Sequence, residues 1–328
     1  MSSTTVTESA SKRPSLVRRV ASACALAAVG VGVAASAATA SAATANVAPP
    51  PSGYSFTTVN DNADPTFNQL LGINARGTIV GYFGSGTPAS LHPNKGYELN
   101  SPYGQADYRN ENFPGSQQTQ VVGINGHGTT VGFWVDANGD NFGFVTWHGQ
   151  FTSVSNPHSN ATPKFDQLLG VNDHDVAVGF YNDTQGNSHG YTYDIQTGQI
   201  RGVNVPGASS VVATGINNAG WISGFATING VTEGFVSHGY HVSLLEVNKS
   251  SNTQILGINN HFRIVGSYVD SQGNTHGFVK APHHSAVTVD DPNAAGTTVI
   301  NGINDNGSIV GFYVDAAGNT DGLLALHS

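Results

Sequence analysis

Two glycines that lie nine positions apart occur six times along this chain of 328 residues. Each pair belongs to a segment that reads approximately L-G-I-N-x-x-G-x-I-V-G-F-Y, and successive first glycines are 51, 47, 45, 42 and 45 residues apart. A repeat of this length is typical of one blade of a β-propeller. The six pairs are Gly72/Gly81, Gly123/Gly132, Gly170/Gly179, Gly215/Gly224, Gly257/Gly266 and Gly302/Gly311.

Each repeat predicts four short antiparallel strands. In the first copy, residues 69–74 and 78–83 form two strands, and the Asn-x-x-Gly between them is a turn, since Asn bonds its own backbone and Gly accepts positive φ. A third strand carries one core residue per copy, and a weaker fourth strand follows, as in residues 199–205. The core residues of the third strands are Tyr97, Phe144, Tyr191, Phe235, Phe278 and Leu323.

The glycines of each pair are expected to lie opposite one another across this turn. A facing pair removes side-chain bulk from one spot, so that a neighbouring sheet or a large side chain can approach closely.

The two ends of the repeat region complement each other. The last copy ends at Ser328 after its third strand, and residues 54–60 read as a fourth strand without its own copy. We therefore expect an all-β fold, a six-bladed propeller of four-stranded blades over residues 54–328, closed by pairing of its N- and C-terminal strands.

The N-terminus has the pattern of a secretory signal peptide. Lys12, Arg13, Arg18 and Arg19 precede an apolar run over residues 20–33, and an Ala-Ser-Ala sequence ends at Ala42. This predicts a signal peptide over residues 1–42, a flexible leader over 43–53 and a secreted, extracellular protein. The run is too short and too rich in small residues to predict membrane insertion.

The composition of the predicted mature chain limits its partners. Removing the four basic residues and Glu8 of the signal leaves 8 Lys and Arg against 20 Asp and Glu, a balance of −12. Such a surface argues against nucleic acid as a partner, because the phosphates would be repelled. Cys24, the one cysteine, lies inside the signal, so neither disulfides nor thiolate ligands are expected in the mature chain. We also expect the protein to be a monomer.

The repeat resembles that of the extracellular HAF-repeat family, approximately G-I-N-x-x-G-x-V-V-G followed by G-x-x-H-A-F. The second half is matched best by residues 186–191 and 273–278, which contain His189 and His276. Glycine replaces the alanine throughout, and the histidine is replaced by Lys95, Phe142, Glu233 or Asp321 in the other copies. The resemblance implies secretion and a propeller-like fold, and it implies no reaction.

Several repeated polar residues have a structural and a functional interpretation. The motif asparagines, such as Asn74 and Asn125, either hold the turns or form a ring of polar groups at one mouth of a central channel. His189 and His276 are expected to make hydrogen bonds within their blades. Asp136, Asn138 and Asp140 alternate like the ligands of a calcium loop but lack a downstream bidentate Glu, so calcium is the one cofactor that the pattern leaves open. Trp221 replaces a small or polar residue at the end of its turn and is a candidate for exposure.

One face of the propeller is predicted to be acidic. Loops from fourth to first strands share a face with those between second and third strands, and both kinds are rich in aspartate. The first copy also has the longest insertion, residues 84–94, and an aromatic and charged cluster follows it. The candidate ligand-binding residues are therefore Tyr103, Asp107, Tyr108, Arg109, Glu111, His92, His158, Asp166, Asp290 and Asp291.

Three functions are compatible with these patterns. The first is a secreted recognition module that binds a polysaccharide or another component of the cell envelope. The second is a polymer-degrading enzyme, a glycoside hydrolase or lyase, that uses carboxylates and a histidine of the acidic face. The third is a structural surface protein. A propeller hosts all three, so the fold does not choose among them.

Overall fold

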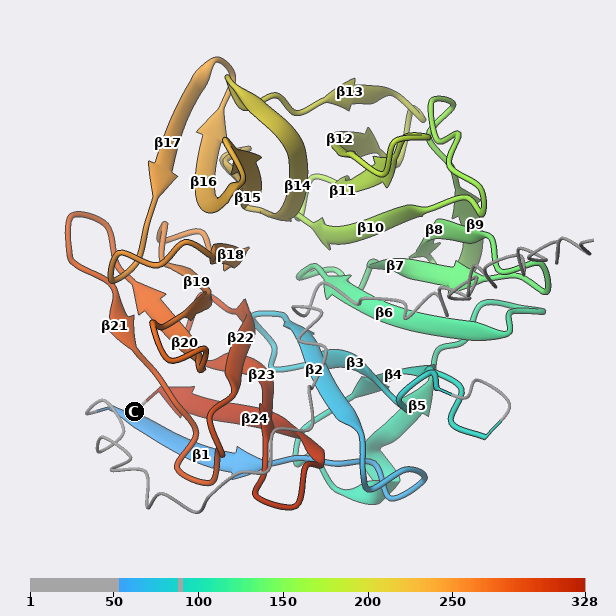
Figure 1. Ribbon diagram of the computed structural model, residues 1–328. Coiled ribbons are helices and arrows are strands. Elements are labelled where there is room, and N and C mark those ends of the chain that lie inside the picture. The colour runs from blue at the N-terminus through green and yellow to red at the C-terminus, as the bar shows by residue number, and fades with distance from the viewer. Residues whose placement is uncertain (1–52, 88–90, 328) are drawn as a thin grey trace, which may run out of the picture.

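The computed structural model describes residues 53–87 and 91–327, and within them six four-stranded antiparallel sheets surround one centre (Figure 1). The predicted six-bladed propeller is therefore confirmed. The predicted signal peptide and nearly all of the leader lie outside the described residues. No helix in the described part of the chain is long and apolar enough to cross a membrane.

The first three blades follow the chain in order. Blade 1 comprises β2 (Asn68–Ile73), β3 (Ile79–Phe83), β4 (Lys95–Leu99) and β5 (Tyr108–Asn110), with the short 3₁₀ helix η1 (Gln105–Asp107) before β5. Blade 2 comprises β6 (Gln118–Ile124), β7 (Thr130–Val135), β8 (Asn141–Trp147) and β9 (Gln150–Val154). Blade 3 comprises β10 (Asp166–Val171), β11 (Val176–Asn182), β12 (Ser188–Asp194) and β13 (Ile200–Gly202).

The other three blades complete the ring. Blade 4 comprises β14 (Ala208–Ile216), β15 (Ile222–Ile228), β16 (Val231–His238) and β17 (His241–Leu245). Blade 5 comprises β18 (Thr253–Ile258), β19 (Ile264–Val269), β20 (Thr275–Lys280) and β21 (Val287–Thr288). Blade 6 comprises β22 (Thr298–Ile303), β23 (Ile309–Val314), β24 (Thr320–His327) and β1 (Tyr54–Thr58). We call the end of the strands with the first-to-second-strand turns the AB face, and the opposite end, with the fourth-to-first-strand loops, the DA face.

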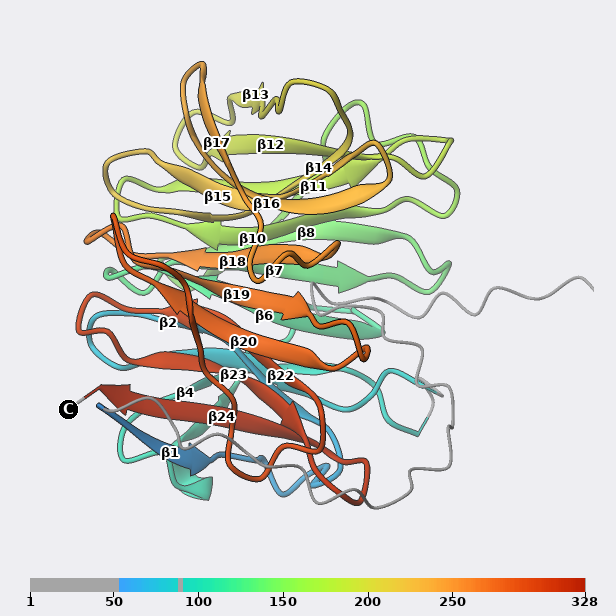
Figure 2. The same cartoon turned by 60° about the vertical axis from the view of Figure 1, so that its left-hand side comes forward.

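The ring is closed as the sequence predicts. Strand β1 pairs antiparallel with β24 from Tyr54 opposite His327 to Thr58 opposite Leu323, and Figures 1 and 2 show the two strands side by side. Next to this pairing, the Asn60 amide donates a hydrogen bond of 2.7 Å to Asp321. Blade 6 is thus assembled from both ends of the repeat region.

The expectation that the two glycines of a repeat face each other is wrong. In blade 1, Gly81 pairs with Leu70 and Gly72 pairs with Val80, because a β-bulge shifts the register between Leu70 and Gly72. The same shift occurs in the first strand of every blade.

The two glycines therefore serve different contacts. A Cβ on Gly72 would lie 2.8 Å from the Val122 carbonyl oxygen of the next blade, whereas one on Gly81 would lie 2.2 Å from the Gln69 carbonyl oxygen of its own blade. The first glycine of each repeat thus lets neighbouring blades approach, and the second accommodates the bulged strand of its own blade.

The motif asparagines join the blades to one another. The Asn74 side-chain oxygen accepts hydrogen bonds from the backbone of its own turn, and its Nδ2 donates to the Asn125 carbonyl at 3.1 Å. Each following asparagine bonds to the next blade in the same way, and Asn304 completes the circle by donating to the Asn74 carbonyl at 3.1 Å. These buried residues hold the turns and the ring together.

Candidate functional site

The central channel is narrow and apolar at its middle. Leu71, Val122, Leu169 and Leu256, together with Thr214 and Asn301, surround a space of about 30 Å³. At the AB face the channel widens to about 90 Å³ between the asparagine turns, where the Asp173 carboxylate accepts hydrogen bonds from Gly126 N and Asn218 Nδ2. This carboxylate is thus engaged by the neighbouring turns.

A cavity of about 390 Å³ lies at the DA face between blades 3 and 4. Its walls come from the hairpin of β11 and β12, from β13 with the loop that follows it, and from the start of β14. Strand β14 is nine residues long, against six or seven for the other first strands, so its early residues line the cavity. We call this space the blade 3 cavity.

One wall of the cavity is a stacked pair of rings. Tyr181 and His189 lie with their centroids 5.1 Å apart and their planes 25° from parallel, and His189 Nε2 is 2.9 Å from Asp183 Oδ2. The hydrogen bond from His189, aided by the backbone N–H groups of the hairpin turn, lowers the pKa of Asp183 to about 2. The predicted bond within the blade is therefore present and holds the imidazole in place.

The floor of the cavity is fixed by a buried carboxyl group. The hydroxyl of Tyr191 donates to Asp166 Oδ1 at 2.6 Å, and Asn156 N donates to Asp166 Oδ2 at 2.5 Å. Burial raises the pKa of Asp166 to about 6, although both hydrogen bonds oppose the rise. Asp166 thus positions Tyr191 and the loop of Asn156, both of which line the cavity.

A glycine on the fourth strand distinguishes this blade from three others. In blades 2, 5 and 6, the indole N–H or the tyrosine hydroxyl of the aromatic residue on the second strand forms a hydrogen bond with a Ser or Thr of the fourth strand. These pairs are Trp134–Ser153 at 3.1 Å, Tyr268–Thr288 at 2.8 Å and Tyr313–Thr58 at 2.8 Å. The equivalent position in blade 3 is Gly202, and the Tyr181 hydroxyl has no hydrogen-bond partner in the described part of the chain.

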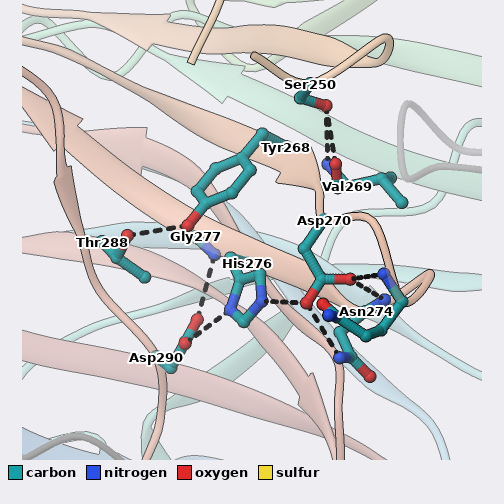
Figure 3. A network of polar contacts seen from close by, with 10 residues as sticks. Ser250, Tyr268, Val269, Asp270, Asn274, His276, Gly277, Thr288 and Asp290 are labelled. Atoms are coloured by element: carbon teal, nitrogen blue, oxygen red, sulfur yellow. Dashed lines mark hydrogen bonds and ion pairs between the residues drawn. The ribbon is translucent and has the colours of Figure 1, made fainter. Parts of the chain in front are cut away.

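In blade 5 the tyrosine hydroxyl and both nitrogens of the histidine are engaged within the blade, and we call this arrangement closed (Figure 3). His276 lies between two carboxylates, with Nε2 3.1 Å from Asp270 Oδ2 and Nδ1 2.8 Å from Asp290 Oδ2. Burial alone would lower the pKa of His276, but the bonds to Asp290 and Asp270 outweigh it and raise the pKa. Blade 3 has Asn204 at the position of Asp290, so only one of the two carboxylates is conserved between these blades.

Two of the predicted site residues lie at the blade 3 cavity. His158 is exposed on its rim, where its backbone N–H donates to Asn156 Oδ1 at 3.0 Å, and Asp166 lies beneath the floor. Asp290 belongs instead to the blade 5 network. The neighbouring Asp291 is buried, which raises its pKa, and it accepts a hydrogen bond of 2.8 Å from Asn293 N.

The predicted residues of blade 1 have separate partners. His92 Nδ1 is 2.8 Å from Asp64 Oδ2 on the DA face, whereas the Tyr103 hydroxyl donates to the Gly77 carbonyl of an AB turn. Asp107 accepts the Gly104 N–H in the turn that precedes η1. These residues do not form one cluster.

The remaining three residues of that group also diverge. Tyr108 packs edge-on against Tyr97, with ring centroids 4.9 Å apart, and Arg109 is exposed beside Glu98 in the neighbouring strand. Glu111 is buried between blades and accepts a hydrogen bond from Thr130; burial raises its pKa to about 7.

The proposed calcium loop has the geometry of a hairpin turn. Asp136 Oδ1 accepts the N–H groups of Asn138 and Asp140 at 2.8 and 3.0 Å, and Asp315 makes the same contacts in blade 6. Asp140 Oδ1 accepts the Lys164 N–H at 2.8 Å. Residues 53–87 and 91–327 contain no group of three or more His, Cys, Asp or Glu that could hold a metal ion.

Tyr181, Gly202 and Asn204 were not among the predicted site residues. Tyr181 itself is an ordinary member of its repeat. The feature that could have identified the site is the equivalent position of the fourth strand, which is Gly202 in blade 3 and Ser153, Thr288 and Thr58 in blades 2, 5 and 6.

The chain is similar to solved propeller structures in fold alone. It matches TolB from Acinetobacter baumannii with a TM-score of 0.52 and 12% identity, over 80% of this chain and 65% of that chain. It matches a fucose-specific lectin from Aleuria aurantia with a TM-score of 0.51 and 10% identity, over 79% and 91% of the two chains. A putative gluconolactonase gives a TM-score of 0.50 and 11% identity, over 85% and 93%.

Sequence comparison adds no closer relationship. No family model matches this chain, and no curated protein matches its sequence. The resemblance to the HAF-repeat family therefore stays a prediction. At such low identities the structural matches show a six-bladed propeller, and they carry no activity with them.

Proposed function

We propose that this protein is a secreted recognition module that binds a glycan of a polysaccharide or cell envelope in the blade 3 cavity. The observation that carries the proposal is the Tyr181 hydroxyl, which lines the cavity and has no partner among the described residues, whereas the equivalent polar groups of blades 2, 5 and 6 bond to the fourth strand. The cavity volume of about 390 Å³ lies within the range of small-molecule sites.

The lining of the cavity matches the two kinds of surface that a sugar presents. Val203, Val205 and Val211 provide apolar contact for C–H groups, whereas Ser210, Asn204 and the Tyr181 hydroxyl offer hydrogen bonds to sugar hydroxyls. The stacked Tyr181 and His189 rings are held in place before a ligand arrives, which lowers the entropy cost of binding. The fucose specificity of the similar lectin supports a sugar as the ligand class.

Binding accounts for this geometry better than polymer cleavage does. A glycosidase needs one carboxyl group that donates a proton and another that faces the sugar. Two carboxyl groups bond to residues that line this cavity. Asp183 bonds to His189, and Asp166 accepts hydrogen bonds from Tyr191 and Asn156. Both groups therefore position other residues.

A glycan array followed by calorimetry tests the proposal. We expect the protein to bind a defined set of glycans, with equal affinity in calcium and in EDTA. Tyr181→Phe should weaken binding about tenfold, because one hydrogen bond to the ligand is worth about 1.4 kcal/mol. Tyr268→Phe is the matched control, since it alters the equivalent tyrosine of the closed blade 5 and should leave the affinity unchanged. Equal affinity of wild type and Tyr181→Phe, or no glycan bound, would overturn the proposal.

A further inference from the structure

Five of the six loops that join one blade to the next on the DA face are held by the same hydrogen bond. A backbone N–H of the loop donates to the side chain that lies four positions before the first glycine of the next repeat. We call this bond the loop anchor. Its donor and acceptor residues are Phe113–Thr119, Val247–Thr253 and Asp291–Thr298 at 3.1 Å, Asp61–Asn68 at 2.8 Å and Asn156–Asp166 at 2.5 Å.

The loop from blade 3 to blade 4 begins in the same way as the others. The Val203 N–H donates to the Gly190 carbonyl at 2.8 Å, and two residues later the Val205 carbonyl accepts the Ala208 N–H at 3.2 Å. Val205 is therefore the residue whose N–H is expected to donate the loop anchor. The matching bonds are Glu111 to Gly96 and Ser116 to Phe113 after blade 1, and Val289 to Gly277 and Ala294 to Asp291 after blade 5.

The acceptor position of this loop is Val211. It pairs with Ala226 on the second strand of blade 4, as Thr253 pairs with Tyr268 in blade 5. Valine has the shape of threonine with a methyl group in place of the hydroxyl, so it has no oxygen that could accept a hydrogen bond. The described part of the chain contains no other acceptor for the Val205 N–H.

This unpaired donor belongs to the blade 3 cavity, which both Val205 and Val211 line. Val205 is 6% exposed, and a backbone N–H that is buried without a partner costs free energy comparable to a lost hydrogen bond. The missing partner is an oxygen atom beside the Val211 methyl groups, where three other loops have a threonine hydroxyl. A sugar hydroxyl has the same chemistry as that group.

We propose that the Val205 N–H is a ligand-binding group of the blade 3 cavity, and that a hydroxyl oxygen of the bound sugar accepts its hydrogen bond in place of the missing threonine hydroxyl. This inference rests on the proposed function of the cavity. It gives the site a second polar contact besides the Tyr181 hydroxyl, and each of the two arises where a polar side chain of the repeat has been replaced. A sugar that lacks the hydroxyl leaves the N–H unpaired and binds more weakly.

Nuclear magnetic resonance of the ¹⁵N-labelled protein tests this contact. The probes are the methyl glycosides of fucose, galactose, mannose and glucose, added one at a time. We expect at least one of them to shift amide resonances of the residues that line the cavity, and to move the Val205 amide proton downfield as it gains an acceptor. Shifts of the other lining residues with Val205 unmoved would overturn this proposal and leave the proposed function standing. No shift with any of the four glycosides would count against the sugar site itself, and with it against this contact.

Val211→Thr supplies the missing acceptor from within the protein. We expect its hydroxyl to bond the Val205 N–H, to slow hydrogen exchange of that amide and to keep or raise the melting temperature. Because the sugar oxygen then has a competitor, the affinity for the glycoside should fall about tenfold. A slowed Val205 amide with the wild-type affinity would overturn the proposal, and an unchanged exchange rate would contradict the equivalence of the loops on which it depends.

Thr253→Val is the matched control. It removes the loop anchor to the Val247 N–H in the loop from blade 4 to blade 5, away from the blade 3 cavity. This variant should lower the melting temperature, and both the glycoside affinity and the ligand-induced shift of Val205 should match the wild type. A loss of affinity in this control equal to that in Val211→Thr would show that loop anchoring in general affects binding, and would also overturn the proposal.

Discussion

Blades 3 and 5 have a tyrosine, an aspartate and a histidine at the same positions of the hairpin formed by their second and third strands. The residues around these three side chains differ between the two blades. In blade 5, Thr288 bonds the tyrosine hydroxyl, and Asp290 holds the second nitrogen of the histidine. In blade 3, the equivalent residues are Gly202 and Asn204, and a cavity of about 390 Å³ is present.

The aromatic and histidine residues of the repeat do not by themselves make a site. Tyr268 and His276 have their polar atoms engaged within the blade, so little remains for a ligand. The Tyr181 hydroxyl has no partner among the described residues because the fourth strand of blade 3 has a glycine where blade 5 has a threonine. What distinguishes the two blades is thus the loss of a contact, and this can be tested by restoring it.

The largest effect is expected from Gly202→Thr. A Cβ on Gly202 would meet no atom within 4 Å, so the larger residue fits without strain. Its hydroxyl should bond the Tyr181 hydroxyl, as that of Thr288 bonds Tyr268 in blade 5, and its side chain should project into the space that a ligand would occupy. We expect glycan affinity to fall about 100-fold, which corresponds to about 2.7 kcal/mol, while the melting temperature stays the same or rises.

Thr288→Gly is the matched control for that variant. It changes the equivalent position of the closed blade and leaves the blade 3 cavity intact, so calorimetry should give the wild-type affinity. Retained glycan binding in Gly202→Thr would show that the cavity is not the site.

The sequence predicts the ring well because its determinants are local. Asn74 and Gly77 define a turn within four residues, and the repeated spacing of that turn predicts six blades. Closure is predicted from residues 54–60, which read as a fourth strand without its own copy. The register of Gly72 and Gly81 was predicted wrongly, because a bulge depends on how the strands pack against the next blade and leaves no mark in the local pattern.

The site is harder to predict for a related reason. Its cavity depends on the missing side chain at Gly202 and on the early start of β14, which belongs to the next blade. His158 and Asp166 could be chosen from their loops, yet Tyr181 is ordinary in sequence and becomes distinctive only beside its partner position.

A second departure from the repeat is a buried carboxyl group in blade 1. Glu111 donates its N–H to the Gly96 carbonyl, as Val203 and Val289 do to the equivalent glycines of blades 3 and 5. Its carboxyl group is buried, which raises its pKa from the ordinary 4.5 to about 7.

Glu111→Val should therefore stabilise the protein above neutral pH. Between pH 4.5 and 7 the folded state keeps a proton that the unfolded state has released, so the free energy of unfolding falls as pH rises, and the full cost is present above pH 7. We expect a gain of about 2 kcal/mol at pH 8 and little change at pH 4, measured by urea unfolding. An equal effect at both pH values would contradict the account, and Glu111→Gln should reproduce the gain if the charge is its cause.

The smallest effect is expected from Asp290→Asn, which gives blade 5 the residue that blade 3 has. The raised pKa of His276 means that its ion pairs stabilise the fold fully below the ordinary value of 6.5, and that this contribution is lost as pH rises through the raised value. Because the His276 side chain is 25% exposed and screened by solvent, removing one charge should cost less than about 1 kcal/mol at pH 6, and the cost should shrink as the imidazole loses its proton at higher pH.

Nuclear magnetic resonance provides the sharper measurement for that variant. The titration of the His276 ring should shift toward lower pH in Asp290→Asn, because one of the two carboxylates that favour the charged imidazole is gone. The ring resonances of His189 at a fixed pH should not move, since its partner Asp183 lies in another blade. An unchanged His276 titration would mean that Asp290 does not hold the ring in solution, and the contrast between the two blades would then depend on Gly202 alone.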